Sequence, residues 1–145
     1  MSQPIRITAV IGTYRKGGMI DSVVDVMLSA AREKGAETTK IYLIDKHIEF
    51  CTNCRSCMQE ADVDYGKCPI EDDMEEILQT ILASDGLILA SPMNFGTVTA
   101  VTKRFIERLA GFGYWPWGRP APKLRLANKK TRRSVIVASS AAPAF

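Results

Sequence analysis

The stretch Ile5-Arg-Ile-Thr-Ala-Val-Ile11-Gly12-Thr-Tyr-Arg-Lys-Gly17-Gly18 decides the fold. Its first seven residues form a short run rich in β-branched apolar side chains, which is typical of a strand buried on both faces of a parallel sheet. The run stops at a glycine-rich loop, and apolar residues at helical spacing follow between Ile20 and Lys34. A buried strand that enters such a loop and then a helix predicts the first βα unit of an α/β domain.

Strands and helices are expected to alternate along the rest of the chain. Further strands are predicted at residues 40–44, 86–90 and 134–138, and further helices at residues 72–82 and 98–109. Repeated Gly and Pro in residues 111–133 predict a long excursion without a helix. Because this alternation folds through right-handed βαβ units, we predict one α/β domain over residues 1–145, with a parallel, doubly wound sheet.

The composition is that of an ordinary globular protein. The chain is 46% hydrophobic and 24% charged, and it has no apolar run long enough to span a bilayer. Its net charge of +3 is small and evenly spread, so nucleic acid is not expected as a partner. The first residues lack a basic region followed by a long apolar stretch, so we expect a cytoplasmic protein that does not insert into membranes.

The glycine-rich loop joins a strand to a helix, where backbone N–H groups and the helix dipole create an anion site. A P-loop is disfavoured because Gly18 and Met19 replace its Lys and Ser/Thr, and the Gly-x-Gly-x-x-Gly of a dinucleotide site is absent. A terminal monophosphate held without metal remains as the hypothesis, with a plain connecting loop as its alternative. The predicted donors are Thr13, Arg15, Gly17 and Gly18.

The loop after the third strand is the second predicted contact region. In open α/β sheets, ligands bind beyond the carboxyl ends of the strands, at the point where the strand order reverses. In the order 2-1-3-4 that point lies between the first and third strands, so residues 91–97 should neighbour the glycine-rich loop. Asn94 and Phe95 would then be placed to contact a flat ring.

Four cysteines interrupt the α/β pattern, namely Cys51, Cys54, Cys57 and Cys68. The first three have ferredoxin-like spacing, whereas ten residues separate the third from the fourth. Thiolates so arranged hold an iron–sulfur cluster or zinc, or cycle between dithiol and disulfide, and the spacing does not distinguish these alternatives. A site that uses all four requires residues 58–67 to fold back.

Together these motifs resemble the flavodoxin-like NAD(P)H-dependent FMN reductases, and more narrowly the branch that contains the iron–sulfur flavoproteins. The resemblance extends over residues 5–140 and depends on four segments, which are residues 12–18, the cysteine segment 51–57 with 66–74, residues 91–96 and residues 103–108.

The resemblance implies a flavodoxin-like three-layer sandwich that binds FMN and transfers electrons from NAD(P)H or an iron–sulfur donor to a flavin, quinone or other small acceptor. Under the iron–sulfur alternative the four cysteines would hold a [4Fe–4S] cluster. Because no room remains after the fourth strand, we expect the order 2-1-3-4 without the fifth strand and its covering helix. Either the chain is a piece of a longer protein, or a partner subunit covers the bare edge and face of the sheet. A homo-oligomer is implied too, since the family's flavin site often borrows residues from a second subunit.

The implied FMN contacts fall into three groups, and no side-chain acid or base is demanded because the flavin carries the chemistry. The phosphate contacts are Thr13, Arg15, Gly17 and Gly18; the ring contacts are Pro92, Met93, Asn94, Phe95 and Gly96; and residues that close the other side are Ser139, Ser140, Ala141 and Ala142. The alternative function is a flavin-free, zinc-stapled or thiol-switched α/β module that binds or senses.

Three further features have open interpretations. His47 is the chain's one histidine and is expected on the surface. Trp115 and Trp117 could cover the flavin, contact a second subunit or pack on their own domain. The basic run at residues 129–133 could meet the 2′-phosphate of NADPH, although a solvated turn is the preferred interpretation.

Overall fold

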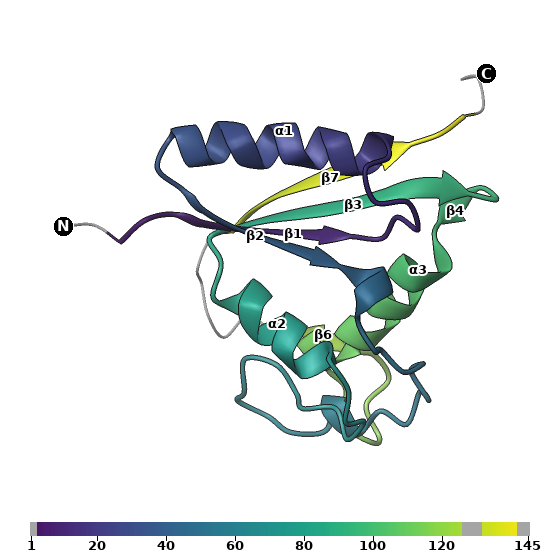
Figure 1. Cartoon of the computed structure of the whole chain (residues 1–145). Coiled ribbons are helices and arrows are strands. Elements are labelled where there is room, and N and C mark those ends of the chain that lie inside the picture. The colour runs from purple at the N-terminus through teal and green to yellow at the C-terminus, as the bar shows by residue number, and fades with distance from the viewer. Residues whose placement is uncertain (1–2, 126–131, 142–145) are drawn as a thin grey trace.

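Four parallel strands form the centre of the molecule (Figure 1). The structure, a computed structural model, describes residues 3–125 and 132–141. The strands are β1 (Arg6–Ile11), β2 (Glu37–Tyr42), β3 (Gly86–Asn94) and β7 (Arg133–Ser139). They pair in parallel in the order β2-β1-β3-β7, which confirms the predicted order of the first four strands. Among the described residues, no further parallel strand pairs with β7.

Helices cover both faces of this sheet. Figure 1 shows α1 (Met19–Glu33) on one side, and α2 (Met74–Leu82) and α3 (Ala100–Glu107) on the other. Each face has its own apolar core, because apolar residues recur at helical spacing, as with Ile20, Val24 and Leu28 on α1. The three layers confirm the flavodoxin-like α/β fold. In the parts that the structure describes, no helix combines the length and apolar character needed to cross a bilayer.

Side chains on either side of its first residue hold the start of α2. The Met74 N–H donates to Asp72 Oδ1 at 3.0 Å, so Asp72 accepts the first amide of the helix. The Glu75 carboxylate accepts a hydrogen bond from the Tyr65 hydroxyl. That bond connects α2 to the chain between Cys57 and Cys68.

Strands β2 and β3 differ from the predicted bounds. β2 begins earlier, at Glu37, and ends at Tyr42 because the chain turns into the short 3₁₀ helix η1 (Leu43–Asp45), which buries Leu43 in the core under α2 and α3. β3 continues to Asn94 and forms a hairpin with β4 (Thr97–Val98), where a loop was predicted. Its two turn residues, Phe95 and Gly96, have φ of 51° and 81°, the positive values that tight two-residue hairpin turns require.

The excursion predicted without a helix at residues 111–133 begins inside a 3₁₀ helix, whereas residues 113–125 contain no helix. The segment follows the 3₁₀ helix η3 (Arg108–Phe112) and forms a small antiparallel ribbon of β5 (Gly113–Tyr114) and β6 (Lys123–Leu124). The ribbon packs against the cysteine segment, because the Trp115 N–H donates to the Met58 carbonyl at 2.9 Å. The excursion therefore supports the cysteine segment.

Candidate functional site

A cavity of about 310 Å³ lies where the carboxyl ends of β1, β3 and β7 meet. Its volume falls in the range of about 300–1,000 Å³ that is common for small-molecule sites. It is lined by Thr13, Tyr14, Arg15, Gly18, Met19, Ile20, Pro92, Asn94 and Ser139. The glycine-rich loop, the end of β3 and the end of β7, which the sequence assigned to one site, therefore surround one cavity, hereafter the strand-end cavity.

The structure does not bring the other predicted contacts into this lining. They are Gly17, Met93, Phe95, Gly96, Ser140 and Ala141, while Ala142 lies outside the described residues. Because side chains alternate along a strand, Pro92 and Asn94 on the cavity side place Met93 on the opposite side. The Phe95 side chain is fully exposed at the hairpin turn. Sequence reasoning also missed Tyr14, Met19 and Ile20, whose only signal was their position beside the glycines.

The glycine-rich loop leaves one cationic side chain available for an anion. The Thr13 hydroxyl accepts a hydrogen bond from the Arg15 N–H at 3.1 Å, which holds the loop's first turn. Lys16 is engaged elsewhere, since its Nζ lies 2.6 Å from Asp45 Oδ2. The exposed Arg15 guanidinium has no ion pair or hydrogen bond with any residue that the structure describes. Arg15 is therefore the loop's cation that can meet a phosphate.

A buried carboxylate lies under the same loop. Asp21 is 3% exposed, and its Oδ2 accepts the Gly17 N–H at 2.5 Å. Its Oδ1 accepts a hydrogen bond from the Tyr42 hydroxyl at 2.8 Å and lies 2.5 Å from Lys40 Nζ. Burial by itself raises the pKa of Asp21, but the Gly17 amide, Lys40 and Tyr42 together lower it below its usual value. Asp21 is therefore anionic at neutral pH.

Three buried hydroxyl groups tie the glycine-rich loop to α3. The Thr99 hydroxyl donates to the Gly12 carbonyl at 2.6 Å. The Thr102 hydroxyl oxygen lies 2.8 Å from that of Thr99 and 3.2 Å from that of Ser91. Gly12 has no space for a side chain, because a Cβ there would lie 1.6 Å from Thr102 Oγ1. The start of the loop is thus held in one place by the helix that follows β3.

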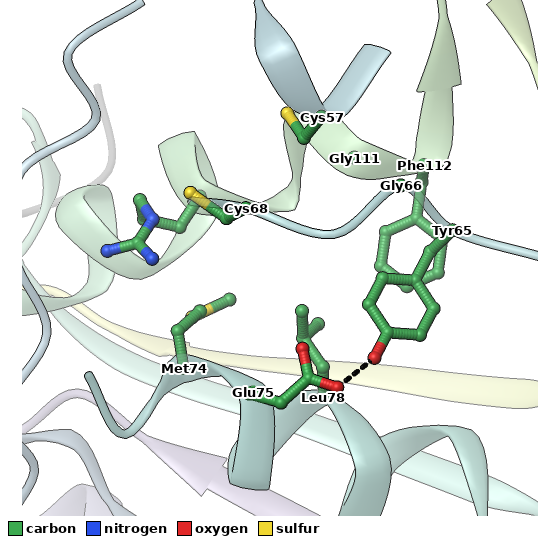
Figure 2. A pocket seen from close by; sticks show the side chains of 10 residues that line it. Cys57, Tyr65, Gly66, Cys68, Met74, Glu75, Leu78, Gly111 and Phe112 are labelled. Carbon is green, nitrogen blue, oxygen red and sulfur yellow. Dashed lines mark hydrogen bonds between the residues drawn. The ribbon is translucent and has the colours of Figure 1, made fainter. Parts of the chain in front are cut away.

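The cysteine loop, defined as residues 51–68, forms a second candidate site on the α2 and α3 side. Figure 2 shows Cys57 and Cys68 beside one small cavity, with Met74 and Leu78 of α2 across it. All four cysteines are free thiols. Residues 58–67 fold back and bring Gly66 beside Cys57, because a Cβ on Gly66 would lie 1.6 Å from the Cys57 carbonyl oxygen. The Gly66 N–H donates to the Gly111 carbonyl at 2.8 Å, which holds this return against η3. The two cavities share no lining residue.

The cysteine thiols influence one another electrostatically. Burial raises the pKa of Cys57, and Coulombic repulsion from the ionised forms of Cys68, Cys51 and Cys54 raises it further. A bound cation or an iron–sulfur cluster would neutralise the charge of such thiolates, so the donor chemistry fits an all-thiolate centre. The geometry is not assembled, however. Across residues 3–125 and 132–141, no three Cys, His, Asp or Glu side chains converge as a ligand set, and the small cavity measures about 10 Å³.

A buried ion pair closes the two ends of the cysteine loop. Arg108 Nη1 lies 2.5 Å from Asp72 Oδ2, and the side chains are 1% and 0% exposed. Arg108 also donates to the Glu49 carbonyl at 2.9 Å, while Asp72 accepts the Glu49 N–H at 2.8 Å. Because Glu49 precedes the first cysteine and Asp72 follows the fourth, the pair fastens both ends of the loop to α3 and η3.

Both tryptophans pack on the cysteine loop. The Arg55 guanidinium carbon lies 3.7 Å from the Trp115 ring centroid and 4.5 Å from that of Trp117. Arg55 also donates to the Trp115 carbonyl at 2.8 Å. Neither ring lines the strand-end cavity, so the structure favours packing on their own domain and gives no support to a cover over that cavity.

The lone histidine and the described part of the basic run make contacts within the protein. His47 is exposed, as predicted, and its Nε2 lies 2.6 Å from Glu49 Oε1. Arg132, in the basic run, donates to the Ser84 and Leu82 carbonyls at 3.1 Å and 2.7 Å. It therefore caps the carboxyl end of α2, and is not part of a solvated turn. Residues 129–131 lie outside the described residues.

Comparison with known proteins agrees with this arrangement. The chain is 38% identical over 104 residues to an iron–sulfur flavoprotein of Methanocaldococcus jannaschii, covering 72% of this chain and 51% of that protein. It is 33% identical over 112 residues to an iron–sulfur flavoprotein of Archaeoglobus fulgidus, covering 77% of this chain and 49% of that protein. The chain thus spans about half the length of these curated relatives.

Solved structures show the same fold. The NAD(P)H:quinone oxidoreductase from Methanothermobacter marburgensis superposes with a TM-score of 0.73 at 15% identity, covering 95% of this chain and 68% of that one. A family model described as NADPH-dependent FMN reductase matches residues 5–139, which is nearly the whole chain. The chain belongs to the NADPH-dependent FMN reductase family.

Proposed function

We propose that this chain is the FMN-binding unit of an oxidoreductase that transfers electrons from NAD(P)H or an iron–sulfur donor to a flavin, quinone or other small acceptor. The observation that supports this is the meeting of the glycine-rich loop with the ends of β3 and β7 around the strand-end cavity. When bound, FMN would supply the redox chemistry of its ring, and the protein would orient it and tune its potential.

The lining residues suit the two ends of FMN. The positive end of the α1 dipole and the unpaired Arg15 guanidinium would hold the terminal phosphate. Pro92 and Asn94 would lie along the ring, with Ser139 on the side of β7. A terminal monophosphate suits a helix N-terminus, so FMN should bind better than FAD, whose two phosphates lie inside the dinucleotide.

Arg15→Ala is expected to weaken FMN binding by about 1.5–3 kcal/mol, roughly 10- to 150-fold in affinity, while leaving riboflavin binding almost unchanged. The reason is that the variant loses a charge-assisted contact with a phosphate that riboflavin lacks. Calorimetric titration with FMN, FAD and riboflavin measures this. Lys16→Ala is the matched control, because it removes the same charge from the same loop at a side chain paired with Asp45.

Two results would count against the proposal. Equal losses for FMN and riboflavin would remove Arg15 from the phosphate site. If the unchanged protein binds neither flavin at micromolar concentration, the FMN-binding function itself is wrong, and the flavin-free zinc or thiol module takes its place.

We also propose that Cys51, Cys54, Cys57 and Cys68 ligate an iron–sulfur cluster. Support comes from the four free thiols, from the return of the chain at Gly66 and from the names of the curated relatives. Anaerobically prepared protein should then be brown and contain iron and sulfide, and each single Cys→Ser change should remove both, because a hydroxyl replaces thiolate poorly.

The flavin site is the internal control for that experiment. FMN affinity should survive each Cys→Ser change, since the two cavities share no lining residue. A colourless protein that contains zinc would assign the cysteines to a zinc site. Protein without either metal would leave thiol chemistry, with Cys51 and Cys54 as the first disulfide pair to test.

A further inference from the structure

One backbone amide of the glycine-rich loop already donates a hydrogen bond to a side chain of the protein. Gly17 has φ of 74°, which directs its N–H toward Asp21 Oδ2 at 2.5 Å. The bond crosses from the loop to the first turn of α1, so it fixes the loop relative to the helix whose N-terminus lines the strand-end cavity. A carboxylate is nevertheless an unusual support for a phosphate site, because its negative charge repels the phosphate, and water screens this repulsion little when the carboxylate is buried.

The charge of Asp21 is compensated from β2. Lys40 Nζ lies 2.5 Å from Asp21 Oδ1 and 2.5 Å from Asp25 Oδ1. Tyr42 adds its hydroxyl to Asp21, and its ring lies 5.0 Å from Lys40 Nζ. The Asp21 and Lys40 side chains are 4% and 20% exposed, so solvent screens this pair less than it screens the surface pairs.

We propose that Asp21 is a positioning residue for the flavin phosphate, and that Lys40 is the counter-ion that allows a carboxylate to hold this loop. The inference rests on the proposed FMN-binding function. Neither side chain lines the cavity, and both act through Gly17 and the loop. Two consequences follow: the acceptor oxygen of Asp21 matters more than its charge, and its charge becomes harmful to a phosphate once Lys40 is removed.

Four variants separate these effects. Asp21→Ala removes the acceptor of the Gly17 N–H and should lower FMN affinity at least tenfold. Asp21→Asn keeps an acceptor oxygen, so its FMN affinity should stay within threefold of that of the unchanged protein. Lys40→Met leaves the negative charge of Asp21 without its counter-ion and should lower FMN affinity at least tenfold. Adding Asp21→Asn to Lys40→Met should restore FMN binding to within threefold. Asp25→Ala, which leaves the Asp21–Lys40 pair intact, is the control and should not change binding.

Riboflavin distinguishes positioning of the phosphate from a general structural role. Calorimetric titration should show riboflavin affinity within threefold in every variant, with circular dichroism and thermal unfolding recorded for each. Parallel losses of FMN and riboflavin, or full FMN affinity in Lys40→Met, would overturn the inference. If a single variant fails to fold, the double variant of Asp21→Asn and Lys40→Met decides. A tenfold loss of FMN affinity in that variant contradicts the role of Lys40 as counter-ion to Asp21. Failure of the unchanged protein to bind FMN would instead contradict the proposed function.

Discussion

Replacing Arg108 with methionine is expected to lower the free energy of unfolding by about 3–5 kcal/mol. The change leaves the fully buried Asp72 carboxylate without its cation, and desolvation of an uncompensated charge is costly. Denaturant unfolding of both proteins measures the loss. The matched control is Lys103→Met, which breaks the exposed pair between Lys103 and Glu107, separated by 2.7 Å on α3, and should cost only about 0.3–0.5 kcal/mol.

The pH dependence gives the same prediction a second readout. In the unchanged protein burial acts to raise the pKa of Asp72, but Arg108 and two backbone N–H groups lower it overall. Its contribution is therefore complete above the ordinary aspartate pKa of about 4 and is lost as the pH falls through the lowered value. Without Arg108, burial favours the protonated acid, so the stability gap between the two proteins should narrow on acidification. A gap that stays constant from neutral pH to about pH 4 would show that the ion pair is not its source.

Gly66→Ala is expected to destabilise the protein by about 1–3 kcal/mol and to disorganise the cysteine loop. A Cβ at this position would lie 1.6 Å from the Cys57 carbonyl oxygen and 3.1 Å from Arg125 Nη2. Because the nearest obstacle is backbone, relief requires the segment that carries Cys57 to move. Unfolding measurements report the cost, and the rate of thiol modification by a disulfide reagent should rise.

Gly86→Ala is the control for that variant. A Cβ on Gly86 would meet its nearest atom, Ile7 Cγ1, at 3.4 Å, which is ordinary van der Waals contact. Alanine also loses less conformational freedom than glycine in a strand, so the change should be neutral or stabilising by about 0.5–1 kcal/mol. Similar thiol reactivity in Gly66→Ala and the unchanged protein would contradict the packing role assigned to Gly66.

The fold was predictable because it depends on local periodicity and on one topological rule. Apolar runs located β1, β3 and β7, helical spacing located α1 and α2, and the rule for ligand sites placed the glycine-rich loop beside the end of β3. The hairpin after β3 was not predicted, because Pro92 and Gly96 are typical of a loop. Met93 and Phe95, which the resemblance assigned to the ring contact, lie outside the lining of the strand-end cavity.

The supporting charges were not predictable from spacing. Arg108 and Asp72 are 36 residues apart, and no spacing rule of helices or strands pairs them. The same holds for Lys40, which the alternation of β2 alone does not connect to Asp21. Tertiary packing selects such partners, so they become visible only when β2, α1 and η3 are placed in space. The cysteine spacing identified candidate ligands, but the path of the backbone decides whether their sulfur atoms converge.

The contact of Arg55 with both indole rings has an optical consequence. Trp115 and Trp117 are the chain's only tryptophans, and both rings contact Arg55, which follows the second cysteine. The strand-end cavity has no tryptophan in its lining. Intrinsic indole fluorescence therefore arises entirely from rings that contact Arg55 of the cysteine loop, and a change in its emission maximum would follow the opening of that loop without any added label.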